Sequence, residues 1–98
     1  SETKVSPISS YPTASRDIAL FVPNEIDPKL IAEKIKDNSG IYFLHSRIFD
    51  VFKKGEQTSY AFRIVLQASD HTLVGEEITS AMDTITRALS LEEGWKMR

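Results

Sequence analysis

Apolar and polar residues alternate in two long stretches of the chain, and this pattern predicts β-strands with one buried face. The first stretch covers residues 16–22. Its core side consists of Ile18, Leu20 and Val22, and its opposite side consists of Asp17, Ala19 and Phe21. The second lies within residues 58–67, and its apolar side is Tyr60, Phe62, Ile64 and Leu66. A strand within residues 42–53 is expected to form a hairpin with it around Gly55, and residues 95–98 predict a last short strand.

Two other stretches have helical spacing. Asp27 and Pro28 suit the cap and first position of a helix, whose short apolar stripe is Leu30, Ile31 and Ile35. Gly40 is expected to end this region with a positive φ. Apolar side chains recur every three to four positions in residues 76–89, which predicts a second helix. Its stripe is Ile78, Ala81, Met82, Ile85, Ala88 and Leu89.

The resulting order, β-α-β-β-α-β, predicts an α+β, ferredoxin-like fold, in which a four-stranded antiparallel sheet carries both helices on one face. The other sheet face is left open. By analogy with other folds of this kind, an open face binds a ligand, often single-stranded RNA. We expect the domain to cover residues 11–98, after a linker or arm at residues 1–10 that is rich in Ser, Pro and Thr.

Asp50 lies inside the second strand, although aspartate is a poor strand former. A buried, unpaired carboxylate is very costly, so we expect Asp50 to point to the open face together with Phe52. Phe49 and Val51 then point to the core, and Ile48 points outward. An outward Ile48 is unfavourable, which indicates that the regular strand begins near this residue or contains a bulge.

The open face is then expected to combine a carboxylate, an aromatic ring, a hydroxyl and a guanidinium on a floor of small residues: Asp50, Phe52, Ser59, Arg63, Ala19 and Ala61. A carboxylate can accept two hydrogen bonds from one planar donor edge, such as the N1–H and amine of an unpaired guanine. A ring can stack on a base, which contributes about 1–3 kcal/mol. The plainer alternative is that Asp50 pairs with Arg16, Arg63 or a nearby lysine on a solvated strand.

The composition fits one soluble domain. A chain of 98 residues suits a single core, and the absence of cysteine excludes disulfides and thiolate metal sites, which fits a cytoplasmic protein. No apolar run is long enough for a membrane span or a signal peptide. The net charge of −2 argues mildly against nucleic-acid binding, but residues 45–63 carry a net +2 and residues 71–93 a net −4.

No catalytic constellation is visible in the sequence. His45 and His71 have no second metal ligand at a recognisable spacing, and we expect both to be surface or structural residues. The chain has no glycine-rich phosphate loop, and its Ser and Thr residues lack a base partner at any recognisable spacing. We therefore expect no active site, metal or cofactor in this domain.

Five motifs follow one another along the chain: "YPTASRDIAL" at residues 11–20, "RIFDVF" at 47–52, "SYAFRIVLQ" at 59–67, "TLVGEEITSAM" at 72–82 and the closing "WKMR". With these motifs in this order, nearly the whole sequence resembles the C-terminal ferredoxin-fold anticodon-binding domain of the phenylalanyl-tRNA synthetase β subunit.

The resemblance implies a non-catalytic part of a cytoplasmic class II ligase, an (αβ)₂ heterotetramer. In that enzyme the α subunit joins phenylalanine to tRNA(Phe) with ATP and Mg²⁺. The implied partners are the anticodon stem-loop of tRNA(Phe), the α subunit and the rest of the β subunit. Family positions matching Asp50, Phe52 and Ser59 read the first anticodon base, a guanine, and the position of Ala19 helps to line the pocket.

The sequence departs from the family pattern in three places. Phe52 replaces the usual tyrosine and loses its hydroxyl, and Thr58 replaces a lysine. Val74 and Gly75 replace Thr–Asp, so the second helix should lack its usual cap, a loss of about 1 kcal/mol. An alternative from another class stays open, namely a ferredoxin-like protein-interaction or small-ligand regulatory module that docks its open sheet on a partner.

Overall fold

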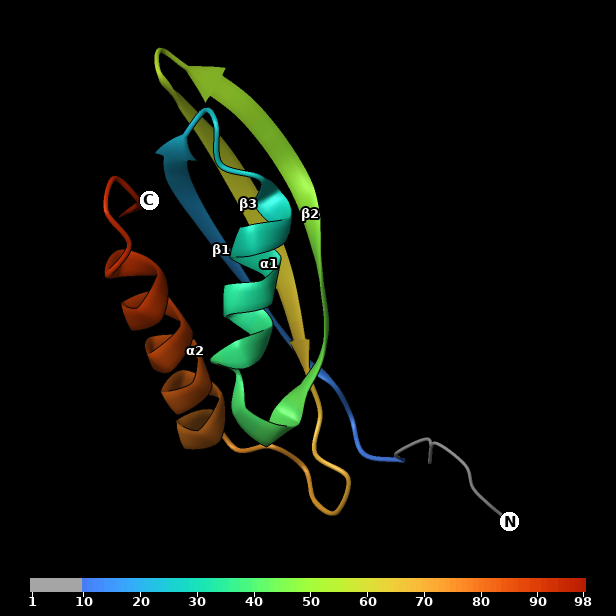
Figure 1. Ribbon diagram of the computed structural model, residues 1–98. Helices are drawn as coiled ribbons and strands as arrows, with labels where there is room; N and C mark the ends of the chain where they lie inside the picture. The colour runs from blue at the N-terminus through green and yellow to red at the C-terminus, as the bar shows by residue number, and fades with distance from the viewer. Residues whose placement is uncertain (1–9) are drawn as a thin grey trace.

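The computed structural model describes residues 10–98, so most of the predicted linker or arm, residues 1–10, lies outside the described residues. The elements follow the predicted order: β1 (Ala14–Pro23), α1 (Pro28–Asp37), η2 (Gly40–Tyr42), β2 (Phe43–Lys54), β3 (Gln57–Leu66), α2 (Gly75–Ser90) and β4 (Lys96–Met97). The strands form one antiparallel sheet in the order β2-β3-β1-β4 (Figure 1). The predicted α+β, ferredoxin-like fold is confirmed.

The core lies between the sheet and the two helices. Its fully buried side chains come from alternate positions of β1 and β3 and from the apolar stripes of α1 and α2: Leu20, Val22, Phe62, Ile64, Leu66, Ile31, Ile35, Ile85 and Leu89. Burial of each large aliphatic side chain contributes about 1.5–3 kcal/mol. Figure 1 shows α1 in front of the sheet and α2 beside it, next to β1.

One residue of the predicted stripe on α1 is not in the core. Leu30 is 41% exposed, whereas Ile31 and Ile35 are fully buried. Ile31 and Ile35 are four positions apart and lie on the same side of the helix, while Leu30 lies roughly 100° further round the axis. The buried stripe of this ten-residue helix is therefore narrower than predicted.

The helix ends follow the sequence closely. Asp27 caps α1 as predicted, because its Oδ1 accepts a hydrogen bond from the backbone N–H of Lys29 at 2.9 Å. Gly40 has the expected positive φ, at 70°. Val74 gives α2 no side-chain cap, also as predicted. Glu77 compensates in part, since its Oε1 accepts from the N–H of Val74 at 3.0 Å.

A β-bulge interrupts the pairing of β2 with β3. Ile48 is opposite Phe62 and Asp50 is opposite Ala61, so Phe49 is the extra residue on β2. The predicted bulge is thus confirmed, but the faces assigned around it are partly wrong. Ile48 shares the helix side of the sheet with Phe62 instead of pointing outward. The ring of Phe49 lies against the guanidinium of Arg63, which is on the open face.

Val51 also differs from its prediction. It lies opposite Tyr60 on the helix side of the sheet, yet it is 52% exposed and does not enter the core. β2 is an edge strand, and Figure 1 shows that the β2–β3 hairpin extends beyond the ends of both helices. The helix side of this part of β2 is therefore uncovered.

No helix within residues 10–98 has the length and apolar character needed to cross a membrane.

Candidate functional site

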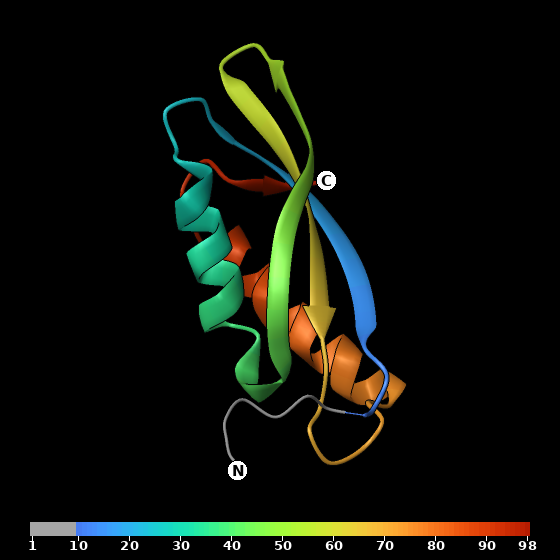
Figure 2. The ribbon, with the colours of Figure 1, turned by 90° about the vertical axis from the view of Figure 1, so that its right-hand side faces the viewer.

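Two rows of side chains run across the open face of the sheet. In the first row Asp50 pairs with Ala61, and Ala61 pairs with Ala19. The second row, one pair further towards the β2–β3 turn, consists of Phe52, Ser59, Phe21 and Lys96. Directly opposite residues of antiparallel strands point to the same face. In Figure 2 this face lies on the side of the sheet away from α1.

The structure places all six of the predicted site residues on this open face. Arg63 belongs to a third row, opposite Arg47 on one side and Asp17 on the other. The burial cost of Asp50 and the alternation of the strands together predicted that these residues share one face. Whether these residues contact RNA stays a prediction.

Asp50 is exposed, and its carboxylate makes no hydrogen bond or ion pair with any side chain of residues 10–98. The alternative in which it pairs with Arg16, Arg63 or a nearby lysine is not what the structure shows. Arg63 pairs with Asp17, and Arg16 donates to the carbonyl of Ser15 at 2.8 Å. Both oxygens of Asp50 are therefore available to a ligand.

Arg63 and Asp17 form a two-point ion pair. The Nε of Arg63 donates to Oδ1 at 2.8 Å and its Nη2 to Oδ2 at 2.9 Å, and its Cζ lies 4.8 Å from the centroid of the Phe49 ring. This hydrogen bonding lowers the pKa of Asp17 and raises that of Arg63. The charge of Arg63 is already balanced, so a phosphate contact by this residue requires the pair to open.

Ser59 is buried by the side chains of its neighbours on the open face. The rings of Phe52 and Phe21 pack edge to face with centroids 5.8 Å apart, on either side of Ser59. Arg98 donates from Nη1 to the Ser59 hydroxyl at 3.0 Å, and its Cζ lies 5.2 Å from the Phe52 centroid. Ser59 is only 1% exposed as a result, so its hydroxyl can meet a ligand only after Arg98 moves.

Arg98 is the main site residue that the sequence reasoning missed. Its backbone N–H donates to the carbonyl of Ala19 at 2.9 Å, which holds it beside β1. The alternation of residues 95–98 separates Lys96 and Arg98 from Trp95 and Met97, and this was the available signal. It does not say which of the two sides faces the core, and only the buried Trp95 settles that.

The two alanines of the first row form the floor of a hollow of about 310 Å³. Its walls include Phe49, Arg98 and Asp17, and Asp50 is the register partner of Ala61 on β2. A floor of methyl groups allows a flat ring to approach the sheet closely. The arrangement can therefore hold a planar group that donates hydrogen bonds to Asp50 and stacks on an aromatic neighbour.

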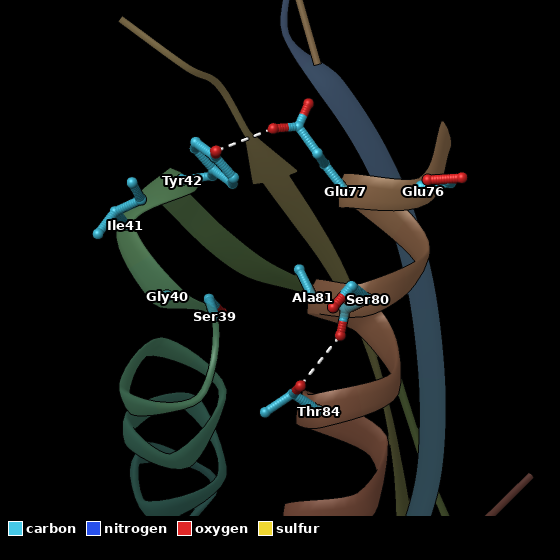
Figure 3. Close-up of a pocket in the computed structure, with 9 residues that line it drawn as sticks. All are labelled: Ser39, Gly40, Ile41, Tyr42, Glu76, Glu77, Ser80, Ala81 and Thr84. Carbon is cyan, nitrogen blue, oxygen red and sulfur yellow. Dashed lines mark hydrogen bonds between the residues drawn. The ribbon is translucent and has the colours of Figure 1, made fainter. Parts of the chain in front are cut away.

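A second hollow, of about 440 Å³, lies between η2 and the first turns of α2, on the helix side (Figure 3). Its buried polar side chain, Ser39, already donates to the carbonyl of Ile35. Glu77 accepts from the hydroxyl of Tyr42 at 2.9 Å, as Figure 3 shows. The side chains of Ser39, Tyr42 and Glu77 are thus already hydrogen-bonded within the protein, so the open face is the stronger candidate.

His71 was predicted to be a surface or structural residue, and its contacts are structural. Its Nδ1 lies 2.7 Å from Asp70 and its Nε2 lies 2.9 Å from Glu77. The bonds to Asp70 and Glu77 raise the pKa of His71, and the bond from the N–H of Val74 lowers the pKa of Glu77. Within residues 10–98 no group of three or more His, Asp or Glu side chains is placed to hold a metal ion.

Known proteins match this chain over nearly its full length. The family model of the ferredoxin-fold anticodon binding domain matches residues 9–98. The phenylalanine–tRNA ligase beta subunit of Trichormus variabilis is 38% identical over 98 residues, which is 94% of this chain and 12% of that protein. The subunit of the same name from Carboxydothermus hydrogenoformans is 35% identical over 102 residues, which is 99% of this chain and 13% of that protein.

A more distant relative of the same name, from Lactiplantibacillus plantarum, is 27% identical over 96 residues, with 94% of this chain covered and 12% of the relative. The chain thus spans only 12–13% of the length of these curated relatives.

Proposed function

The chain belongs to the ferredoxin-fold anticodon binding domain family, and on this premise we propose that its open sheet face binds the anticodon stem-loop of tRNA(Phe). The relatives are named phenylalanine–tRNA ligase beta subunits, so we assign this chain to such a subunit. In that setting it would hold the tRNA while an α subunit, with ATP and Mg²⁺, attaches phenylalanine in the cytoplasm. The domain itself would contribute recognition of the tRNA anticodon.

The observation that carries this proposal is the unpaired, exposed carboxylate of Asp50 beside the alanine floor. An unpaired guanine presents an N1–H and an exocyclic amine side by side, and a carboxylate accepts both. Adenine presents one donor and one acceptor on the same edge. An adenine would therefore leave one oxygen of Asp50 facing a nitrogen lone pair, which is unfavourable. Asp50 is suited to select guanine at the first anticodon position.

Phe52 supplies the stacking surface in this proposal. Its ring is 40% exposed and lies on the same side of β2 as Asp50, two residues along the strand. Stacking of a base on an aromatic ring contributes about 1–3 kcal/mol. The ring gives affinity for any base, whereas the carboxylate gives the preference for guanine.

The proposal is tested by titrating two anticodon stem-loops, with guanine or adenine at the first anticodon position, against the wild type and Asp50→Asn. This substitution keeps the shape of the side chain but replaces one acceptor oxygen with an amide nitrogen. We expect the guanine loop to bind about 10–100-fold more weakly to this variant, and the adenine loop to bind at least as tightly as to the wild type, because the amide presents adenine with one acceptor and one donor. Asp37→Asn, an exposed carboxylate on α1, is the matched control and should behave as the wild type. An unchanged preference for guanine in Asp50→Asn contradicts the proposal.

A second candidate, a protein-interaction module, is favoured by one observation. Five apolar side chains of the edge strand β2 are 37–52% exposed: Leu44, Ile48, Phe49, Val51 and Phe52. If they form an interface between two copies of the chain, the open face is closed to RNA. Sedimentation equilibrium distinguishes the two, since RNA binding on the open face predicts a monomer and the alternative predicts a stable dimer that the stem-loop cannot dissociate.

A further inference from the structure

Three cations that have no acidic partner within the described part of the chain lie close together on the open face. Arg63 is paired with Asp17, but none of the ion pairs among residues 10–98 includes Lys54, Lys96 or Arg98. The three gather around one ring, that of Phe21. The Nζ of Lys54 lies 5.9 Å and the Cζ of Arg98 lies 5.8 Å from its centroid, and Lys96 is the register partner of Phe21 on β4.

These cations line a hollow of about 270 Å³, with Phe21, Gln57 and Met97 as its other lining residues. No Asp or Glu side chain of the described residues lines it. The side-chain amide of Gln57 is already engaged, since its Nε2 donates to the carbonyl of Gly94 at 3.3 Å. Three positive charges around one hollow repel each other, and an anion placed between them removes this repulsion.

Arg98 connects this hollow with the alanine-floored one, because it lines both. The rows that the two hollows occupy are one same-face pair apart, a spacing of roughly 6.6 Å along a strand. A single nucleotide can bridge such a distance between its base and its backbone. The two hollows are thus suited to take two parts of one RNA chain.

We propose that the hollow formed by Lys54, Lys96 and Arg98 binds a backbone phosphate of the RNA, next to the base that Asp50 selects. This inference rests on the proposed function and adds a second subsite to it. Arginine presents a planar fork that matches a phosphate, and lysine contributes a mobile point charge. The RNA strand then runs from the alanine floor towards the β2–β3 turn.

Salt dependence separates this subsite from base reading, because each phosphate contact releases counterions and carries no sequence information. The affinity of the guanine stem-loop is measured at several salt concentrations for the wild type, Lys54→Gln, Lys96→Gln and Arg98→Gln. We expect each variant to flatten the slope of log K against log salt concentration by about 0.7–1. The guanine and adenine loops should lose affinity by the same factor. Lys36→Gln, an exposed lysine on α1, is the control and should keep the wild-type slope.

Two further variants sharpen the result. Arg98→Lys retains the charge and should restore the wild-type slope, whereas a merely structural role of Arg98 predicts no rescue. Asp50→Asn should lose the preference for guanine but keep the slope. Lys54 and Lys96 are exposed, so their variants should fold, which the unfolding temperature verifies.

Wild-type slopes in Lys54→Gln and Lys96→Gln, together with an intact Asp50-dependent preference for guanine, would overturn the phosphate subsite and leave the proposed function standing. A wild type that does not bind the stem-loop would overturn both. Inorganic phosphate, added at constant ionic strength, tests the source of the anion. If it saturates the hollow without changing the affinity for RNA, the assignment to the RNA backbone is wrong.

Discussion

Arg98 donates a hydrogen bond to the hydroxyl of Ser59 at 3.0 Å, and the two residues are 39 positions apart in the chain. The same guanidinium lies 5.2 Å from the centroid of Phe52. It therefore covers the ring and the hydroxyl that a base would use. A base that stacks here and reaches Ser59 has to displace the guanidinium, which can then bind a phosphate in the subsite proposed beside Lys54 and Lys96.

Ser59→Ala removes the acceptor of this hydrogen bond. Ser59 is buried, but the guanidinium of Arg98 can turn to water, so we expect the free energy of unfolding to fall by only about 0.5–1.5 kcal/mol. Urea unfolding measures the change. Ser69→Ala, an exposed serine after β3, should change stability by less than about 0.5 kcal/mol. A loss of stability for Ser59→Ala no larger than that of the control would mean that the bond contributes nothing in solution.

Phe52→Ala removes the proposed stacking surface. Because stacking is worth about 1–3 kcal/mol, affinity for the stem-loop should fall about 5–150-fold, equally for guanine and adenine loops. Val51→Ala is the control, since Val51 lies on the same strand but points to the helix side and is 52% exposed. Phe52→Tyr installs the residue typical of the family and should bind at least as tightly as the wild type. A Phe52→Ala variant with wild-type affinity is incompatible with a base on this ring.

Val74→Ser should stabilise the domain. Val74 has an extended conformation at the N-cap of α2 (φ −95°, ψ 162°) and is 56% exposed, so a serine loses little burial there. Its hydroxyl can accept from the first turn of the helix, while Glu77 keeps its bond to the backbone N–H. We expect a gain of about 1 kcal/mol, measured by thermal unfolding. Val74→Ala controls for the loss of the valine and should show no gain; equal stabilities of the two variants would argue against the cap.

His71 makes the stability of the domain pH-dependent. It faces Asp70, Glu77 and the ring of Tyr42, and hydrogen bonds to the two carboxylates raise its pKa above the usual 6.5. The folded state thus favours the protonated form. This contribution is fully present below about pH 6.5 and is lost as the pH rises through the higher pKa of the folded state.

The measurement is the unfolding temperature between about pH 5.5 and pH 8.5, at values spaced by about half a unit around the ordinary histidine pKa. The wild type should lose stability towards the alkaline end, and His71→Gln should flatten this part of the profile. His45→Gln, on the exposed edge of β2, should retain the wild-type profile. If His71→Gln reproduces the wild-type profile, another group causes the dependence.

The sequence predicted the elements and the open face because these depend on local periodicity. Leu20 and Val22 alternate with Ala19 and Phe21, and Phe62 and Ile64 alternate with Ala61 and Arg63, which sets the faces of β1 and β3. The faces of β2 were harder, because its pairing with β3 shifts register twice, and the extra residue Phe49 reverses the alternation next to Asp50. A bulge was inferred from the conflict between Asp50 and its apolar neighbours, but its register depends on pairing with a distant strand.

The remaining features of the site depend on contacts between distant segments. The pairing of Arg63 with Asp17 and the position of Arg98 over Phe52 and Ser59 follow from strand order and side-chain packing. Neither leaves a signal at fixed spacing in the sequence. The free carboxylate of Asp50 is likewise a result of its neighbours, since the arginines that might neutralise it are engaged elsewhere.

In the proposed recognition, Asp50 accepts hydrogen bonds from both donors of the first anticodon base. The sharpest test of this claim exchanges that guanine for inosine, which lacks only the exocyclic amine, and compares the binding of both stem-loops to the wild type and to Asp50→Asn. We expect the wild type to lose about 1–3 kcal/mol with inosine, and Asp50→Asn to bind both loops with nearly equal affinity. Equal binding of the two loops by the wild type, or an undiminished difference in Asp50→Asn, would contradict the claim.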